Sequence, residues 1–312
     1  MSYIPIVFST DHRYVMPAGV AIYSLLASSR GERYDIFVLV GGDVDSDDRE
    51  QLRKQVESAD SGSRITFIEM YDLFANAYET RSITRASYYR LLIPWMIPQY
   101  DKIFYSDVDV IFQHGLGELW STDIGDNYIA GVNFSTSGIL LTNIKRLGLD
   151  PEKYINMGFL LINSKLFRDD NLKDTLLQHA NRKYRYQDQD ILNIVCKDRI
   201  AYLPPKSNCK VSRVDRFGIE ECGLIHYTGL KPWVCFTCCW ERWWEIYKQS
   251  IFYDSTLRGR VLSNMKTVIG RTNEEYETGF APLVIIARKL SLKFPVINKI
   301  LIKIIRLVHG EG

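Results

Sequence analysis

The sequence predicts an α/β protein in which a mainly parallel sheet lies between layers of helices. Short apolar runs rich in β-branched and aromatic residues alternate with helix-like segments, and such alternation is typical of parallel sheets. Polar residues follow several of these runs at the point where each run stops, which is where ligands bind to α/β sheets. With 312 residues, the chain can form one large domain or two smaller ones, and its composition does not decide between them.

The first elements read as a strand, a loop and a helix. Residues 3–8 are the expected strand, residues 9–14 its loop, and Pro17 suits the first turn of a helix that runs to about residue 29. A ligand at this edge would meet Asp11, which can accept a hydrogen bond, and Tyr14, which can stack on a flat ring. The same two residues can instead start the helix and pack locally, so both interpretations remain open.

Residues 34–40 and 64–70 read as the next two strands, and Ser46 is the expected cap of a polar helix between them. No G-x-G-x-x-G follows any of these strands and no G-x-x-x-x-G-K-[ST] occurs, so we expect neither a dinucleotide site nor a P-loop. Residues 87–92 read as a helix that carries Arg90. Its guanidinium can bind a phosphate or a sugar hydroxyl, although an arginine on a helix more often forms a surface ion pair.

The chain is organised around residues 103–111, which read I-F-Y-S-D-V-D-V-I. Residues 102–106 are an expected buried strand, and two acids follow where it ends. Because alternate residues of an extended chain point the same way, we expect Asp107 and Asp109 to share one face, with Val108 and Val110 in the core. Two hard oxygen ligands at this position suit Mg²⁺ or Mn²⁺ holding a phosphorylated ligand. The alternative is a solvated turn that happens to contain two aspartates.

Two further buried strands are expected at residues 128–133 and 157–162. The long segment between them, residues 135–154, is expected to form a flap over a ligand. Asn156 precedes the second of these strands and can face the same crevice. Residues 186–193 then read Y-Q-D-Q-D-I-L-N, and these amides and acids can either cap a helix or bind a polyhydroxylated substrate.

A last apolar run leads into H-Y-T-G-L-K-P-W at residues 226–233. His226 can complete a metal site begun by two carboxylates, Gly229 lets the backbone approach a phosphate, and Lys231 can neutralise that phosphate. A lone histidine after an apolar run is more often structural, so this stretch alone does not establish a metal site.

All six cysteines lie in the second half of the chain, and we expect free thiols. Cys235-x-x-Cys238 and a more distant pair can hold Zn²⁺, although the second pair lacks the close spacing of a zinc knuckle. The first eight residues contain no basic segment followed by a long apolar one. We therefore expect no signal peptide and a cytoplasmic protein.

The C-terminal tail differs in charge from the rest of the chain. Residues 281–312 hold six Lys/Arg and one Glu, a net +5, whereas residues 1–280 hold 33 basic and 36 acidic side chains, a net −3. Lys299, Lys303 and Arg306 fall on one helical face with apolar residues on others, and no uncharged run approaches the ~20 residues that span a bilayer. We expect a catalytic domain at residues 1–255 and a basic amphipathic tail at residues 256–312.

The tail is expected to lie on the anionic inner face of the plasma membrane as a peripheral anchor. The alternative is a helix docked on the protein's own core.

Six stretches of the chain, in the same order, resemble the motifs of glycosyltransferase family 8. That family comprises retaining enzymes and includes bacterial lipopolysaccharide galactosyl- and glucosyltransferases and glycogenin. The resemblance covers about residues 4–247. Its motifs are D-H-R-Y at 11–14, S-Y-Y-R-L at 87–91, Y-S-D-V-D-V at 105–110, N-M-G-F-L-L-I-N at 156–163, Y-Q-D-Q-D-I-L-N at 186–193 and H-Y-T-G-L-K-P-W at 226–233.

The resemblance implies a GT-A fold, a UDP-glucose or UDP-galactose donor, and Mn²⁺ as cofactor with Mg²⁺ as the alternative. The implied metal ligands are Asp107, Asp109 and His226. The implied donor-binding residues are Asp11, Tyr14, Arg90, Asp107, Val108, Asn156, Gly229 and Lys231. The implied catalytic residues are Gln189, beneath the anomeric carbon, and Asp188, which would hold the donor sugar.

The implied reaction transfers a hexose to a glycan or lipid-linked acceptor in cell-surface polysaccharide or lipopolysaccharide biosynthesis, with no nucleic-acid partner. Two departures from the family pattern stand out. Lys231 is one residue closer to His226 than is usual, and Asn133 stands in the region where the family tends to carry an acid, so the choice of sugar is expected to differ. Two other functions stay open: a phosphatase of the haloacid dehalogenase type and a non-catalytic UDP-sugar-binding module.

Overall fold

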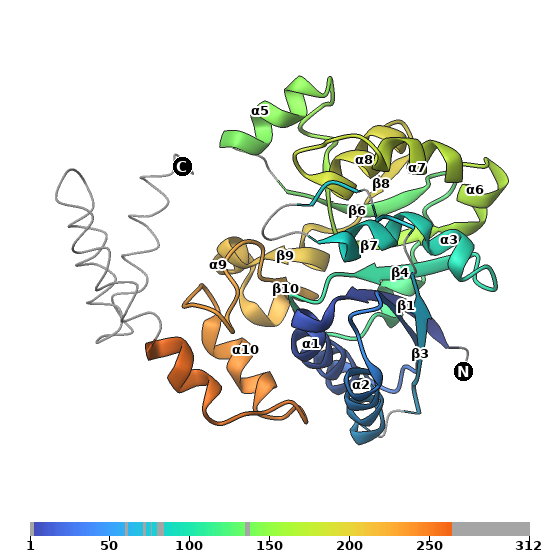
Figure 1. Cartoon of the computed structure of the whole chain (residues 1–312). Helices are drawn as coiled ribbons and strands as arrows, with labels where there is room; N and C mark the ends of the chain where they lie inside the picture. Colours follow the sequence, from blue (N-terminus) through green and yellow to red (C-terminus); the bar gives the residue numbers. More distant parts are fainter. Residues whose placement is uncertain are drawn as a thin grey trace, which may run out of the picture.

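The computed structural model describes residues 3–59, 62–70, 73–75, 77–79, 84–134 and 138–263. Its main sheet is built from β1 (Ile4–Thr10), β2 (Tyr34–Val40), β3 (Arg64–Glu69), β4 (Lys102–Ser106), β6 (Ile129–Asn133), β7 (Ile155–Asn163) and β8 (Ile200–Tyr202). The strand order is β3-β2-β1-β4-β7-β6-β8 (Figure 1). Neighbouring strands are parallel except on the two sides of β7, which is antiparallel to β4 and β6. The expected α/β fold with a mainly parallel sheet is therefore confirmed.

A second, smaller sheet has the order β5-β10-β9 and consists of β5 (Val110–Phe112), β9 (Cys209–Lys210) and β10 (Leu224–His226). It joins segments that lie far apart in the sequence, because β10 pairs antiparallel with β5 and places His226 opposite Val110. The sequence contains no local signal for this pairing. It is the feature that brings His226, where the last sequence motif begins, back to the pair of aspartates at residues 107 and 109.

The central strands are buried on both faces. β1 and β2 are buried along their whole length, as their continuous apolar sequences indicate. Alternate residues of β1 enter different cores: Ile6 and Phe8 pack on one side of the sheet and Val7 on the other. The strand continues two residues beyond its expected end, since Ser9 and Thr10 still pair with β2.

Helices cover both faces of the main sheet. One core contains α1 (Val15–Ser28) and α2 (Ser46–Ser58). The opposite core contains η2 (Arg85–Leu92), α3 (Ile93–Met96), α6 (Ser164–Asp169), α7 (Lys173–Ala180) and α8 (Gln187–Val195). The shorter elements are η1 (His12–Tyr14), α4 (Gly117–Trp120), α5 (Gly138–Arg146), η3 (Pro205–Asn208), η4 (Val211–Arg213), α9 (Val214–Phe217) and η5 (Ile219–Glu221).

Two local expectations need correction. The cap of α2 is Asp45 rather than Ser46, because the Asp45 carboxylate accepts from the backbone N–H groups of Asp47 and Asp48 while the Asp48 side chain accepts in return. The expected helix over residues 87–92 is the end of a longer 3₁₀ helix, η2.

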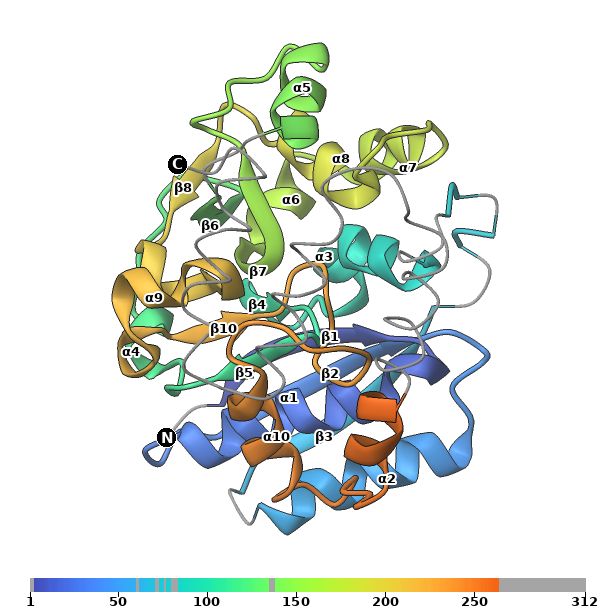
Figure 2. The ribbon, with the colours of Figure 1, turned by 90° about the vertical axis from the view of Figure 1, so that its left-hand side faces the viewer.

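A third core lies around α10 (Trp240–Tyr247), which packs beside α1 (Figure 2). Three of its buried members, Trp243, Trp244 and Tyr247, have rings that contact one another. Ile111 of β5 and Ile225 of β10 belong to the same core. Helix α10 therefore packs against the small sheet and supports it.

Most of the basic amphipathic tail predicted at residues 256–312, namely residues 264–312, lies outside the described residues. In the described part of the chain, no helix is both long and apolar enough to span a membrane. All six cysteines are free thiols, as expected.

Helix α1 and the segment after α10 approach each other at a glycine. A Cβ on Gly19 would overlap the Phe252 ring, and Phe252 packs against two of the three cores. We predict that Gly19→Ala lowers the free energy of unfolding by ~1–3 kcal/mol, because overpacking outweighs the ~1 kcal/mol that alanine contributes to helix propensity. Chemical denaturation measures the change. In a Phe252→Ala background the same substitution should be neutral or stabilising, and equal destabilisation in both backgrounds would contradict this explanation.

Candidate active site

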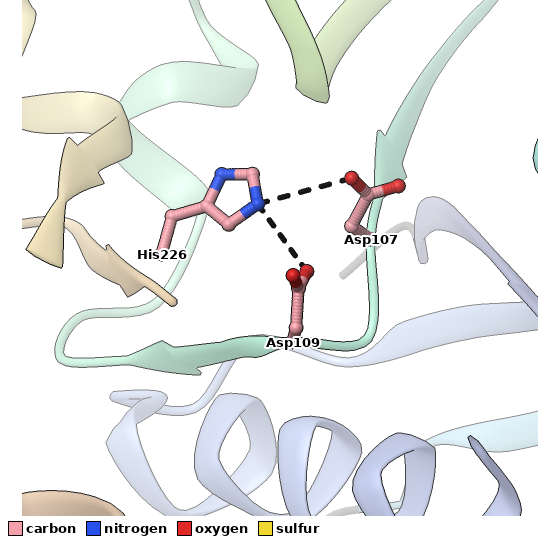
Figure 3. Close-up of side chains that lie close together, drawn as sticks. All are labelled: Asp107, Asp109 and His226. Atoms are coloured by element: carbon pink, nitrogen blue, oxygen red, sulfur yellow. Dashed lines mark ion pairs between the residues drawn. The ribbon is translucent and has the colours of Figure 1, made fainter. Parts of the chain in front are cut away.

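Three potential metal ligands converge beyond the end of β4. Asp107 follows β4, Asp109 precedes β5, and His226 ends β10. The His226 Nε2 atom lies 3.2 Å from Asp109 Oδ1 and 3.8 Å from Asp107 Oδ2 (Figure 3). Among the described residues, this is the group of three whose ligand atoms all lie within 4.8 Å of one another.

The reason for the convergence differs from the expected one. We expected the two aspartates to share a face of an extended strand, but the backbone bends at Val108 and Asp109 before β5 begins. The bend, together with the pairing of β5 and β10, turns both carboxylates towards His226. Val108 and Val110 are buried, as expected.

The donor set fits a divalent cation. Carboxylate oxygens suit Mg²⁺ or Mn²⁺, and an imidazole nitrogen favours a transition metal such as Mn²⁺ over Mg²⁺. Neighbouring side chains bind only one carboxylate oxygen of Asp107: its Oδ1 accepts from Arg90 Nη2 and from the Tyr105 hydroxyl, both at 2.8 Å. Its Oδ2 is the atom that faces His226.

A glycine on β7 leaves room for these ligands. A Cβ on Gly158 would overlap the His226 ring and lie 2.7 Å from Asp107 Oδ2. The Gly158 carbonyl also accepts the Asp107 N–H at 2.8 Å. Sequence analysis quoted Gly158 within a motif without giving it a role, although a lone glycine inside an apolar strand signals close approach of another group.

A cavity of about 490 Å³ opens beside the metal-ligand set. It lies between the carboxyl ends of β1 and β4, where the strand order reverses and where ligands of open α/β sheets bind. Every site residue named from the sequence lines this cavity: Asp11, Tyr14, Arg90, Asp107, Val108, Asp109, Asn156, Asp188, Gln189, His226, Gly229 and Lys231.

Arg90 is buried rather than part of a surface ion pair. Its guanidinium contacts Asp107 and also Asp188, with 3.0 Å between Arg90 Nε and Asp188 Oδ2, and lies over the Tyr105 ring. Burial raises the pKa of Asp188 to about 6, although Arg90 opposes this shift. The arginine thus supplies the positive charge between the buried Asp188 and the half-buried Asp107.

Asp11 has an unused acceptor. Its Oδ2 accepts from Arg13 Nη2 at 3.2 Å and from the Thr84 hydroxyl at 3.0 Å, while its Oδ1 is buried with no partner in the described structure. Asp11 stands at the N-cap position of η1, but its side chain makes no capping hydrogen bond. A buried acceptor without a partner favours a ligand that donates there.

Lys231 lies closer to the metal ligands than the sequence indicates. Its ammonium contacts the Asp109 carboxylate and donates to the Tyr227 carbonyl at 3.0 Å. Burial lowers the pKa of Lys231, but the Asp109 carboxylate raises it above its ordinary value. Burial would raise the pKa of Asp109, yet Lys231 and His226 hold it well below its usual range, so Asp109 stays ionised. Gly229 has a φ of 87°, a left-handed conformation that favours glycine.

The run Q-D-Q-D forms the first turn of α8 rather than its cap. Asp188 and Gln189 line the cavity. Gln187 and Asp190 are instead buried and bind protein atoms: Gln187 donates to the Tyr78 carbonyl at 2.6 Å, and Asp190 accepts the Tyr186 N–H at 3.0 Å. The two inner residues of the run, Asp188 and Gln189, therefore face the cavity, and the two outer residues hold the fold.

The flap expected over residues 135–154 contains α5, and Leu140 of that helix lines the cavity. Two asparagines attach the flap. Asn133 donates to the carbonyls of Pro151, Glu152 and Tyr154 at 2.7–3.0 Å. Asn143, on α5, donates to both carboxylate oxygens of Asp190 at 3.0 Å.

Sequence analysis gave no role to several other cavity residues, among them Tyr105 and Thr228. Tyr105 holds Asp107, and Thr228 lines the cavity with a buried hydroxyl that has no partner in the described structure. Both lie inside quoted motifs, so their positions were visible although their roles were not. The described cysteines do not form a set of metal ligands.

Comparison with known proteins identifies the family of this chain. The family model described as glycosyl transferase family 8 matches residues 5–235. A putative glycosyltransferase of Haemophilus influenzae is 29% identical over 241 residues, which cover 72% of this chain and 71% of that protein. A lipopolysaccharide 1,2-glucosyltransferase of Escherichia coli K12 is 25% identical over 276 residues, which cover 81% of this chain and 77% of that protein. The solved structure of the galactosyltransferase LgtC, in complex with donor and acceptor sugar analogues, superimposes with a TM-score of 0.70 at 26% identity and covers 82% of this chain and 99% of that one.

The close packing at Gly158 gives a test of the ligand set. We predict that Gly158→Ala weakens Mn²⁺ binding at least ~10-fold, because the new methyl group displaces His226 and Asp107. Mn²⁺ titration followed by electron paramagnetic resonance measures this. Gly131→Ala is the matched control: a Cβ there meets only the side chains of Ile155 and Leu160 in the same sheet at under 3.4 Å. That control should lower stability without changing Mn²⁺ affinity, and equal losses in both variants would refute the prediction.

Proposed function

The chain belongs to glycosyltransferase family 8 and has the GT-A fold, and from this premise we propose that it is a metal-dependent, retaining hexosyltransferase with a UDP-sugar donor. The observation that carries the proposal is the convergence of Asp107, Asp109 and His226 beside a cavity at the switch point of the sheet. A family D-x-D is thereby joined to a histidine from a distant strand, which is the arrangement needed to hold a cation against a diphosphate.

The nucleotide end of the donor is assigned to the edge beyond β1. The unpartnered Oδ1 of Asp11 is an acceptor for the N3–H of uracil, and the half-buried Tyr14 ring offers a surface for stacking. This places the diphosphate towards Gly229 and the metal ligands. The left-handed backbone at Gly229, with open space where a Cβ would be, lets a phosphate oxygen approach closely.

The chemical step separates the sugar from the diphosphate. Mn²⁺ held by Asp107, Asp109 and His226 would stabilise the negative charge that develops on the leaving diphosphate. The Lys231 ammonium adds a fixed positive charge at the same place. Neither group needs to move a proton, so no strong base is required.

The sugar is assigned to the floor of the cavity. Arg90, Asn156 and Asp188 offer hydrogen bonds to its hydroxyls, and Gln189 lies beneath the anomeric carbon, where its amide oxygen stabilises positive charge as the sugar leaves. Because a glutamine is a poor nucleophile, the acceptor hydroxyl attacks from the face that the leaving group vacates, and its proton passes to the departing diphosphate. Such an attack retains the configuration of the anomeric carbon.

The acceptor is proposed to be a glycan or a lipid-linked glycan of the cell surface, assembled at the inner face of the plasma membrane. A lipopolysaccharide glucosyltransferase among the relatives and a galactosyltransferase among the solved structures support this class and leave glucose and galactose as the candidate sugars. Asn133 replaces the family's usual acid, and its amide is already used by three carbonyls of the flap. Asn133 therefore ties the two ends of the flap together.

The family match contradicts a phosphatase of the haloacid dehalogenase type. A UDP-sugar-binding module without activity is separated from the transferase by turnover, and the next experiment measures it.

We predict slow, Mn²⁺-dependent release of UDP from one member of a panel of UDP-sugars without added acceptor. Asp109→Ala should abolish this release, because it removes one of three metal ligands and the partner of Lys231. Asp126→Ala, at an exposed position ahead of β6, should leave it unchanged. UDP binding without any turnover would favour the binding module, and a sugar adduct on a side chain, found by mass spectrometry, would exclude same-face attack.

We predict that the full chain floats with vesicles containing anionic lipid and stays in solution with neutral vesicles. Replacing Lys299, Lys303 and Arg306 together by Glu should abolish flotation, because the +5 charge of the tail attracts the anionic surface. A form ending near Thr278 should behave in the same way. Equal partitioning of all three proteins would exclude membrane association through the tail.

A further inference from the structure

We propose that Asn208 is a positioning residue that fixes which nitrogen of His226 carries the proton, and so keeps Nε2 free to bind the metal. The inference rests on the metal-dependent function proposed above. Asn208 belongs to none of the family motifs quoted from the sequence. It ends η3, directly before β9, whose Lys210 pairs with His226 of β10.

The two ring nitrogens of His226 face two different acceptors. Nδ1 lies 3.0 Å from Asn208 Oδ1, and Nε2 lies 3.2 Å from Asp109 Oδ1. A neutral imidazole has a single N–H, which can serve only one of them. If the proton sits on Nε2, the ring donates to Asp109 and has no lone pair for a cation. A hydrogen bond from Nδ1–H to Asn208 selects the form that can bind metal.

The orientation of the Asn208 amide is fixed by its other neighbour. Its Nδ2 lies 3.0 Å from Asn156 Oδ1, which also accepts the Gly158 backbone N–H at 3.0 Å. Because a backbone N–H can only donate, the Asn156 atom must be the oxygen, and Asn208 must present its NH₂ group to it. The Asn208 oxygen is then left facing His226. Reversing the amide would oppose two oxygens at one end and lose the acceptor at the other.

The same logic extends to the catalytic amide. Gln189 Oε1 accepts from Asn156 Nδ2 at 3.0 Å and from the Met157 N–H at 3.3 Å, and Gln189 Nε2 donates to the Tyr154 hydroxyl at 3.2 Å. That hydroxyl donates to Asp190 Oδ1 at 2.6 Å. Because the hydroxyl has a single proton and donates it to Asp190, it can only accept from Gln189, so this end of the chain of hydrogen bonds also has a single possible direction.

The result is one directed chain of hydrogen bonds that runs between the metal ligand His226 and the carboxylate of Asp190. Asn208 is 1% exposed, Tyr154 3% and Asp190 0%, so water has little access to these three members. Each donor and acceptor along the chain is set by its neighbours, and no member can reverse alone. Asn208 is the member of the chain that bonds His226, and through Asn156 it connects His226 to Gln189.

Two substitutions separate the roles of the amide. Asn208→Leu has a similar volume and removes both hydrogen bonds, so the His226 proton is free to move to Nε2 and bind Asp109. Asn208→Asp keeps an oxygen for the Nδ1–H group but places its second oxygen against Asn156 Oδ1. We expect the first variant to lose metal affinity and turnover, and the second to lose mainly turnover, because only the link towards Gln189 is broken.

The tautomer is measured directly in metal-free protein carrying ¹⁵N-histidine. Two-bond ¹⁵N–¹H correlation spectra identify the protonated nitrogen, and His226→Gln assigns the signal. The experiment is done at a pH above the usual range of imidazole titration. We expect protonated Nδ1 in the wild type and protonated Nε2 in Asn208→Leu. Protonated Nε2 in the wild type, or an unchanged tautomer in the variant, would overturn the proposal whether or not the protein is a transferase.

Metal affinity is measured by Mn²⁺ titration in the presence of UDP, followed by electron paramagnetic resonance. We expect Asn208→Leu to weaken Mn²⁺ binding 10- to 100-fold, the range typical of groups that orient a ligand, and Asn208→Asp to change it much less. Asn193→Leu is the matched control, because Asn193 is a buried asparagine that bonds backbone atoms of Ile155 and Gln189 without contacting His226. It should lower stability and leave Mn²⁺ affinity unchanged.

The outcomes distinguish this proposal from the function on which it rests. Wild type that binds no Mn²⁺ would count against the metal-dependent function, and the tautomer measurement would then decide the role of Asn208. Wild type and Asn208→Leu that bind Mn²⁺ equally well would overturn the positioning role while leaving the function intact. Thermal unfolding of each variant checks that a loss of affinity does not come from a loss of fold.

Discussion

The antiparallel pairing of β5 with β10 is the interaction on which the site depends. Each strand has only three residues, yet their register places His226 opposite Val110 and therefore beside Asp109. So short a pair needs support from packing. The aromatic core around α10 supplies it, with Ile111 and Ile225 packed among its members. The chain beyond the last catalytic motif is thus part of the device that holds the metal ligands.

Charge balance is the second constraint on the site. Asp107, Asp109 and Asp188 line one cavity, and buried acids of like charge destabilise a fold unless they are compensated. Arg90 compensates two of them and Lys231 the third. Positive charge is therefore present beside all three acids before any cation arrives.

Much of the fold was predictable because its signals are local. Continuous apolar runs gave the central strands, and the strand at Lys102–Ser106 was predicted with its observed bounds. The convergence of the two aspartates was predicted for the wrong reason, since a bend replaces the expected extended chain. The roles of Gly158 and Asn208 could not be predicted, because each depends on atoms brought close by pairing between distant segments. Periodicity within a segment carries no information about such contacts.

The flap is joined to the rest of the site in a way that separates chemistry from recognition. Asn133 holds the two ends of the flap together, and Asn143 holds α5 against Asp190. Ile139 on the same helix is exposed. Mutations at an exposed position such as Ile139 can accumulate without disturbing the reacting atoms, whereas Phe134 is constrained because its ring packs against His226. Enzymes descended from a common ancestor with this architecture could therefore acquire new acceptors by drift in a single surface segment and keep one inherited catalytic centre.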